Sequence, residues 1–331
     1  MRNRSHLTQW LPAATLLAVS ALGVGLSAGS SGWGWAGSEI MSEIRAPRVL
    51  AGFGCGAALA LAGALMQLLT RNALADPAVL GVSGGAAVGA MAALLFAPAL
   101  AATTGAAAVL ASMLGAGIGA LVATAVLLGL SWRLLSRPGI SSAAGEGTVT
   151  LLLLGVMIGS ACAALLSLML ALAPDAALRG MVFWLLGDLN GVQHWWPVCV
   201  SAGLALLLVL PHARQLDQLA RGEAWATSLG VAVATRRRVA LIAAALAVGA
   251  AVATAGAVGF VGLVVPHALR LLGVRAAPAL LPASALVGGS FIVVVDALAR
   301  TIVAPTQLPV GVLAALIGVP MFVHLLLRGL R

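Results

Sequence analysis

The chain has 331 residues, of which 62% are apolar and 8% charged, and its mean hydropathy is +1.11. A soluble domain usually carries charge on about a quarter of its residues, so this composition excludes an ordinary soluble protein and indicates a membrane protein with many spans. The net charge of +9 comes from 18 arginines against 9 acidic residues, and lysine is absent. In a membrane protein such a charge reports the orientation of the loops and does not imply a nucleic-acid partner.

Apolar runs separated by polar or Pro/Gly-rich breaks predict an all-α polytopic fold, with ten transmembrane helices in one domain over residues 1–331. The predicted spans cover 10–29, 48–69, 83–97, 104–131, 148–173, 193–210, 238–256, 260–273, 279–300 and 310–328. Short extra helices are expected before the sixth span, at 177–187, and before the tenth. The third and eighth spans are short for a full crossing.

The first apolar run, from Trp10 to Ser27, resembles the apolar part of a signal peptide. It is longer than the roughly 7–15 residues usual there, so we expect it to be retained as the first span. The three cysteines each lie inside an apolar run, and their spacing matches no metal site. We therefore expect buried structural thiols at Cys55, Cys162 and Cys199.

Two of the apolar runs carry rows of small residues at four-residue spacing. The rows are Gly52, Gly56, Ala60 and Ala64, and then Gly115, Gly119 and Ala123. Small residues let helix backbones approach closely, which is how helices associate where lipid offers no hydrophobic drive. We expect most of these residues to pack within the chain, with a seam between two copies as the alternative for some.

The arginines are distributed unequally between the two sides of the predicted layout. With the N-terminus inside, 14 of the 18 fall in cytoplasmic segments, and four fall outside, namely Arg45, Arg48, Arg179 and Arg300. Arginine gathers on cytoplasmic loops. The distribution therefore predicts a multi-pass protein of the bacterial inner membrane, with both termini in the cytoplasm.

Certain kinds of chemistry are missing from the sequence. The middles of the ten runs hold no Asp, Glu or Arg, whereas ion-coupled transporters use ionisable residues at that depth. The chain also has no GxxxxGK[ST] loop to hold the phosphates of ATP. We therefore expect no catalytic residue, metal or cofactor on this chain; if it moves a substrate uphill, ATP and Mg²⁺ belong to partner subunits.

A polar loop at 211–237 interrupts the second half of the chain. Gly222 and Gly230 divide it into short helical pieces, since glycine readily ends a helix. Within the stretch GEAWATSLG, Glu223 begins a helix, where its charge is favourable, and Trp225 and Leu229 share one helix face.

A short helix with one apolar face suits docking into the groove of a partner. The alternative is a helix that lies on anionic lipid, with the arginines at 236–238 as anchors.

Five segments resemble, in their order along the chain, the permeases of type II ABC importers. This family imports iron siderophores, haem and cobalamin. The segments are IRAPRVLAG (44–52), RNALADPAVLGVSGGA (71–86), GEAWATSLG (222–230), GFVGLVVPHALR (259–270) and LPVGVLAALIGVPMFVHLLLR (308–328). The likeness extends from about residue 40 to the C-terminus, with Ala73 where the family usually has proline. It implies ten spans, a second copy of the chain around a central pathway, two cytoplasmic ATPase subunits and a periplasmic substrate-binding protein.

The resemblance also assigns roles to residues. It makes the polar loop a cytoplasmic coupling loop, with ATPase contacts at Gly222, Glu223, Ala226, Leu229 and Gly230. The pathway would be lined from the fifth and tenth spans by Leu153, Val156, Gly159, Ser160, Leu313 and Leu316. The binding protein would dock through acidic residues onto Arg45, Arg48 and Arg300; contact with lipid headgroups is the alternative.

Three further residues carry weaker expectations. Asp296 lies one turn before Arg300 and is expected to pair with it. His267 is expected to be a satisfied structural group rather than a ligand, and His194 is a weaker candidate for transient contact with substrate.

These observations lead to one expected function and several alternatives. We expect the permease subunit of an ATP-driven importer that takes an iron chelate, haem or a ferric siderophore, from a periplasmic binding protein. Cobalamin is the alternative substrate within the same family. A ten-span secondary transporter and a purely structural membrane subunit are the alternatives outside it.

Overall fold

Long apolar helices make up most of the chain, as the apolar runs predict. A computed structural model describes residues 3–29, 32–96, 105–135 and 146–329. The long helices are α1 (Asn3–Ser27), α3 (Ala46–Thr70), α4 (Val82–Phe96), α6 (Gly105–Leu135), α7 (Glu146–Leu172), α9 (Trp196–Val209), α12 (Val233–Ala255), α13 (Val261–Leu271), α14 (Ala277–Thr301) and α15 (Val310–Gly329).

Shorter elements connect these helices. They are β1 (Ala28–Gly29), β2 (Gly32–Trp33), α2 (Ser38–Ile40), the π-helical turn η1 (Met41–Arg45), the 3₁₀ turn η2 (Pro77–Leu80), α8 (Asp175–Leu185), the 3₁₀ turn η3 (Leu210–His212), α10 (Ala213–Arg221) and α11 (Glu223–Ser228). The two strands pair antiparallel over two residues each, a feature that the sequence did not indicate. α8 occupies the place expected for a short helix at 177–187.

Seven segments in the described part of the chain are long and apolar enough to cross a membrane. They correspond to all or part of α1, α3, α6, α7, α9, α12 and α14. α4, α13 and α15 carry shorter apolar stretches, which agrees with the shortness expected of the third and eighth spans. The predicted ends at 97 and 104 lie outside the described residues.

The short helix expected before the last span is absent from the structure, and this expectation was wrong. Residues 302–306 form turns, and 307–309 have no regular structure. Pro305 and Pro309 account for the difference, because proline lacks an N–H group and disfavours helical geometry at the residue before it. The segment instead folds back on α14, where the Leu308 N–H donates to the Ala299 carbonyl at 3.1 Å.

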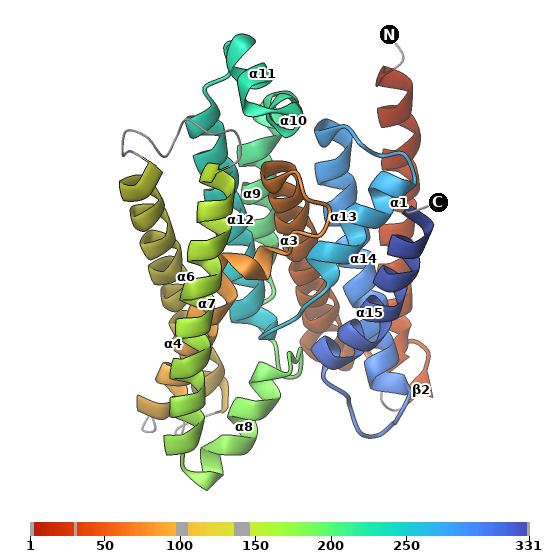
Figure 1. Cartoon of the computed structure of the whole chain (residues 1–331). Coiled ribbons are helices and arrows are strands. Elements are labelled where there is room, and N and C mark those ends of the chain that lie inside the picture. The colour runs from red at the N-terminus through yellow and green to blue at the C-terminus, as the bar shows by residue number, and fades with distance from the viewer. Residues whose placement is uncertain (1–2, 30–31, 97–104, 136–145, 330–331) are drawn as a thin grey trace.

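α3 lies at the centre of the bundle and contacts α9, α12, α13 and α14. α4, α6 and α7 pack together on one side of it, and α1 packs against α14 on the other (Figure 1). The N-terminal end of α1 lies at the same end of the bundle as α10 and α11, whereas α8 and β2 lie at the opposite end (Figure 1).

The predicted rows of small residues bring helix backbones of this chain into contact. A Cβ atom added at Gly56 would overlap the carbonyl oxygen of Gly288 on α14. One added at Gly119 on α6 would overlap the carbonyl oxygen of Gly85 on α4, and the neighbouring Gly115 meets Gly89 in the same way. Packing within the chain is thus confirmed for these positions.

The three cysteines are free thiols in the bundle. Cys55 and Cys162 are buried, as expected, whereas Cys199 is only partly buried. The Cys55 thiol donates to the Ala251 carbonyl at 3.7 Å, and the Cys199 thiol donates to the Leu50 carbonyl at 3.4 Å.

The close contact of α4 with α6 can be tested with two glycines of the same helix. Gly119→Leu forces a side chain into the Gly85 backbone, whereas among the described residues no atom beyond its chain neighbours and the backbone of α6 lies within 4 Å of the Cβ position at Gly117. Overpacking a close contact costs about 3 kcal/mol at the upper end of its usual range. We expect Gly119→Leu to lower the midpoint of thermal unfolding in detergent and Gly117→Leu to leave it near the parent value. Equal losses in the two variants would contradict this packing.

Candidate functional site

A cluster of buried charges lies at the α8 and β2 end of the bundle. Arg48, in the first turn of α3, donates from Nη2 and Nε to Oδ1 of Asp296 on α14, at 2.9 and 3.0 Å. Its Nη1 donates to the side-chain oxygens of Asn190, at 2.8 Å, and Gln307. Arg48 is 5% exposed and Asp296 1% exposed. The pair is therefore a buried ion pair whose remaining donors are satisfied by amides.

Arg300 shares the same carboxylate and also holds the chain that precedes α3. Its Nε lies 3.1 Å from Oδ2 of Asp296, one turn earlier on α14. Its Nη1 and Nη2 donate to the carbonyls of Ala28 and Gly25, at 2.9 and 3.1 Å. The expected pairing of Asp296 with Arg300 is confirmed, and Asp296 bridges two arginines rather than one.

Arg45 closes the cluster from the π-helical turn η1. Its Nη1 donates to the carbonyls of Leu26, Ser27 and Gly34, at 2.9, 3.2 and 2.7 Å. A Cβ atom added at Gly29 would overlap Nη2 of Arg45, so the lack of a side chain at Gly29 permits the approach.

A cavity of about 380 Å³ opens among these side chains; we name it the outer cavity, because the arginine distribution predicts that this end faces outwards. Arg45, Arg48 and Arg300 line it together with Glu43 and the amides Asn190, Gln193 and Gln307. Next to it, the Asp188 carboxylate accepts from the Asn190 N–H at 2.9 Å. Burial raises the pKa of Asp188, while that hydrogen bond and the charge of Arg48 act to lower it.

The three arginines expected as exposed docking charges are thus brought together, but they are buried. Arg45 is 7% exposed and Arg300 3% exposed, because Asp296 and backbone carbonyls attract the guanidinium groups inward. The alternative, in which isolated arginines contact lipid headgroups, does not fit this buried arrangement. Sequence reasoning missed Asn190 and Gln307, which are 142 and 259 residues from Arg48 in the chain and carried no local signal.

The polar loop lies at the opposite end of the bundle and forms the two helices that its glycines indicate. α10 ends at Gly222, which has φ of 140°, and α11 ends just before Gly230, which has φ of 78°. Residues with side chains rarely adopt these backbone angles. The division of the polar loop at Gly222 and Gly230 is confirmed.

α11 presents an apolar face to its surroundings. Trp225 is 53% exposed and Leu229 51% exposed, as the spacing of the two residues indicates. Ala226 points the other way and is fully buried against the chain itself. Ala226 is therefore a packing position in this structure rather than a contact surface, because α11 needs one small residue where it rests on the bundle.

Two acidic residues tie the polar loop to the spans. Glu223 forms ion pairs with Arg237 of α12 and, at 3.7 Å, with Arg71 at the end of α3. Asp217 on α10 accepts from the N–H of Ala277, the first residue of α14, at 2.8 Å. Burial raises the pKa of Asp217, and the Ala277 hydrogen bond and nearby arginines oppose that rise.

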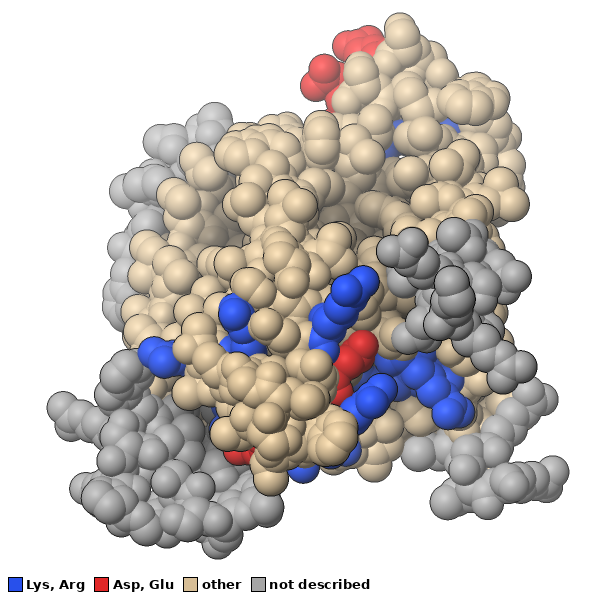
Figure 2. All heavy atoms as spheres, turned by 90° about the horizontal axis from the view of Figure 1, so that it is seen from above, with Lys and Arg blue, Asp and Glu red and all other residues tan. Residues whose placement is uncertain are grey.

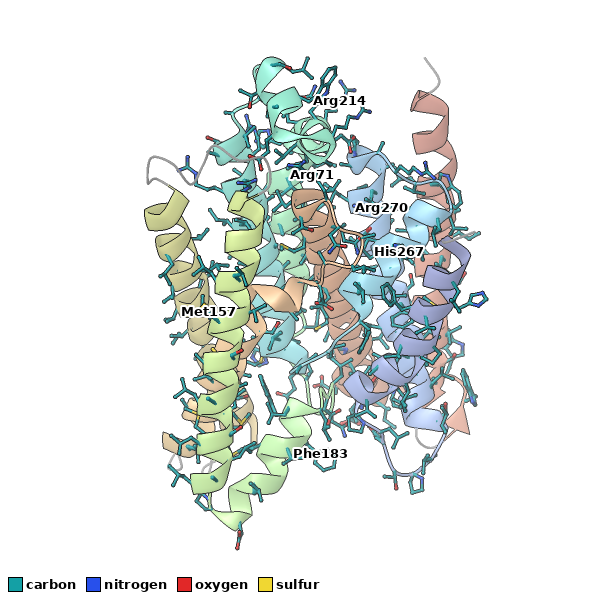
Figure 3. The ribbon with its side chains drawn as sticks, in the orientation of Figure 1. Arg71, Met157, Phe183, Arg214, His267 and Arg270 are labelled. Atoms are coloured by element: carbon teal, nitrogen blue, oxygen red, sulfur yellow. The ribbon has the colours of Figure 1, made fainter. Side chains whose placement is uncertain are left out.

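Arginine side chains gather on the α10 and α11 end, which Figure 2 shows from above. Figure 3 shows Arg214 on α10, with Arg71 beneath it. Three of the arginines that predict the orientation lie outside the described residues: Arg2, Arg137 and Arg331.

Most of the residues expected to line a pathway lie exposed on the surface of this single chain. Leu153 and Val156 on α7 and Leu316 on α15 are more than half exposed, Ser160 is exposed, and Gly159 is partly exposed. Leu313 differs, because it is 6% exposed. It lies three residues before Leu316, and α15 packs on α13 and α14, so only part of the helix surface is open.

The histidine of α13 is packed but not hydrogen-bonded. The His267 ring meets the Phe322 ring edge-on, with centroids 5.8 Å apart. Within the described part of the chain neither ring nitrogen has a hydrogen-bond partner, so the expectation of a satisfied group is met only in packing. Figure 3 shows His267 and Arg270 on the same helix.

The described ranges contain no group of three His, Cys, Asp or Glu side chains that suits a metal ion.

Comparison with known proteins gives a consistent result. Residues 13–328 match the model of the FecCD transport family. The chain is 39% identical to the vitamin B12 import system permease protein BtuC of Escherichia coli O157:H7 (strain EC4115 / EHEC), over 98% of this chain and 96% of that one. It is 38% identical, with the same coverage, to the protein of that name from Shigella boydii serotype 18.

A solved structure shares the fold. It is described as an inward-facing conformation of a metal-chelate type ABC transporter, and the TM-score is 0.82 at 28% identity, over 96% of this chain and 98% of the other. The family model and the permease relatives each span nearly the whole chain. The chain therefore belongs to the FecCD transport family and is a permease subunit of an ABC importer, without a catalytic role of its own.

Proposed function

We propose that this permease imports cobalamin. The observation that supports this substrate is the 38–39% identity to vitamin B12 import permeases over 98% of the chain. The comparisons thus favour cobalamin, the alternative, over the iron chelate that the sequence motifs led us to expect first. Haem or a ferric siderophore is the second candidate. The likeness to a metal-chelate type transporter does not separate the two, because cobalamin is itself a metal chelate.

The active assembly in this proposal contains two copies of the permease in the inner membrane. The support is the exposed apolar face of α7, which carries Leu153, Val156 and Met157 and which a second copy would cover. Leu316 on α15 is similarly exposed. An apolar surface between the copies suits the passage of a bulky ligand without tight binding.

In this assembly the chain crosses the membrane ten times, if α4, α13 and α15 cross along with the seven longer segments. An even number of crossings leaves both termini on the same side of the membrane, and the bias of arginine makes that side the cytoplasm in this proposal. The arginine-rich α10 and α11 end is then cytoplasmic, in agreement with the usual bias of arginine.

The energy for transport comes from two ATPase subunits that hold ATP and Mg²⁺. We place their contact at α11, where Trp225 and Leu229 form an exposed apolar face between Gly222 and Gly230. Ala226 supports this helix from beneath. A short exposed helix of this kind is a typical insert for a groove.

A periplasmic binding protein would deliver the ligand at the opposite end, at the outer cavity. Arg48 and Arg300 are held by Asp296, and their main contribution is to shape the cavity. The hydrogen bonds of Arg45 to the three carbonyls all come from Nη1. We therefore assign the contact with an acidic residue of the binding protein chiefly to Arg45.

The substrate is tested by reconstituting the permease with its ATPase and binding protein in liposomes. We expect saturable, ATP-dependent uptake of radiolabelled cobalamin, and ATP hydrolysis that cobalamin-loaded binding protein stimulates. A ferric siderophore and haem serve as competitors. Uptake of an iron chelate without uptake of cobalamin would refute the substrate and leave the permease role intact.

The ATPase contact is tested at Leu229. Burying a leucine is worth about 2 kcal/mol, so Leu229→Asp should weaken ATPase binding at least roughly 30-fold. Affinity is measured by titrating the ATPase onto the permease in nanodiscs. Leu229→Met keeps the volume and apolar character and should bind normally. Normal binding by Leu229→Asp would exclude this face.

The docking of the binding protein is tested with two opposite changes in the outer cavity. Arg45→Gln removes a positive charge and should weaken docking roughly tenfold at low salt, because charge at an interface mainly steers the partner. Glu43→Gln removes a negative charge from the same cavity and should strengthen it. Salt should diminish both effects. A loss of affinity in both variants would indicate damage to the cavity instead of a charge effect.

A further inference from the structure

Glu223 lies in the exposed helix of the polar loop, but its side chain is directed towards the chain itself. It begins α11 after Gly222. Its Oε1 atom pairs with Nη2 of Arg237 and lies 3.7 Å from Nη2 of Arg71. One carboxylate therefore meets guanidinium groups from two different spans.

These two arginines belong to helices of the buried centre. Arg71 ends α3, the helix that contacts α9, α12, α13 and α14. Arg237 lies in the second turn of α12, whose later residues from Ala240 to Ala255 are mostly buried. Glu223 is thus in direct contact with residues of two helices of the packed centre.

The geometry separates two roles within α11. Trp225 and Leu229 are about half exposed, whereas the Glu223 side chain is 31% exposed and that of Arg237 14% exposed. The apolar residues are open to a partner, while the acid is partly covered and already paired. The expected role of Glu223 as a direct ATPase contact does not follow from this arrangement.

We propose that Glu223 is a positioning residue that connects α11 to α3 and α12, so that a movement of α11 imposed by the ATPase moves both spans. The inference rests on the proposed ATPase contact at α11. It assigns binding of the ATPase to Trp225 and Leu229, and transmission of the movement to the Glu223 carboxylate with Arg71 and Arg237.

If the ion pair served only to stabilise the fold, Glu223→Gln would lower the amount of folded complex. The proposed role predicts a different result. Partly exposed ion pairs contribute little to folding stability, so Glu223→Gln should fold and insert normally. Energetic coupling between two sites usually corresponds to a factor of about 5 to 150. The loss should therefore appear in the coupling of ATP hydrolysis to transport, and not in the amount of folded complex.

The test uses the complete importer in liposomes, with three readouts for each variant: ATPase affinity, ATP hydrolysis stimulated by loaded binding protein, and uptake. For Glu223→Gln we expect parental ATPase affinity, with stimulated hydrolysis and uptake reduced about tenfold. Arg237→Glu should show the same loss. Combining Glu223→Arg with Arg237→Glu restores an opposite-charge pair with α12 but places two positive charges together at Arg71. We therefore expect it to recover part of the uptake, and the excess over the sum of the single effects measures the coupling of the pair.

Arg275→Gln is the matched control, because Arg275 is an exposed arginine in the connection between α13 and α14 and takes no part in this pairing. It should transport normally. The inference is overturned if Glu223→Gln loses ATPase affinity in proportion to uptake, if the charge exchange recovers nothing, or if Glu223→Gln transports normally. Failure of the unaltered chain to bind an ATPase would instead refute the proposed function.

Discussion

The structure depends on the close approach of helix backbones around α3. Lipid is as apolar as the helices, so association requires tight packing rather than the hydrophobic effect. Gly56 meets Gly288 of α14, and Gly63 meets Gly262 of α13, with no space for a Cβ atom at either position of α3. Because α3 is held so closely along its length, its two ends are fixed relative to the rest of the bundle. Those ends carry Arg48 and Arg71.

At the α8 and β2 end this fixed position brings charges together in a buried site. Asp296 accepts from both Arg48 and Arg300, and removing one partner of a buried ion pair typically costs about 3–5 kcal/mol. Arg300 and the neighbouring Arg45 also donate to backbone carbonyls at the end of α1 and in β1. The cluster thus shapes the outer cavity as well as charging it.

At the α10 and α11 end, α3 takes part in a different kind of contact. Arg71 meets the carboxylate of Glu223, and Asp217 meets the first N–H of α14. The polar loop is therefore bonded to α3, α12 and α14 while it keeps Trp225 and Leu229 exposed. Such an arrangement suits a segment that must both bind a partner and transmit its movement. The open faces of α7 and α15 fit the assembly of two copies in the proposed importer.

Local patterns in the sequence determined the apolar helices, the two short helices of the polar loop and the small-residue contacts, because hydropathy and glycine act on neighbouring residues. The ordered motifs also indicated the family. The tertiary structure alone decided the burial of Arg45, Arg48 and Arg300, because their partners are up to 275 residues away in the chain. It likewise decided that Glu223 pairs inwards, that Ala226 and Leu313 are covered, and that the residues before α15 form turns. Each of these outcomes depends on which helices become neighbours, and that information is not carried by any single segment.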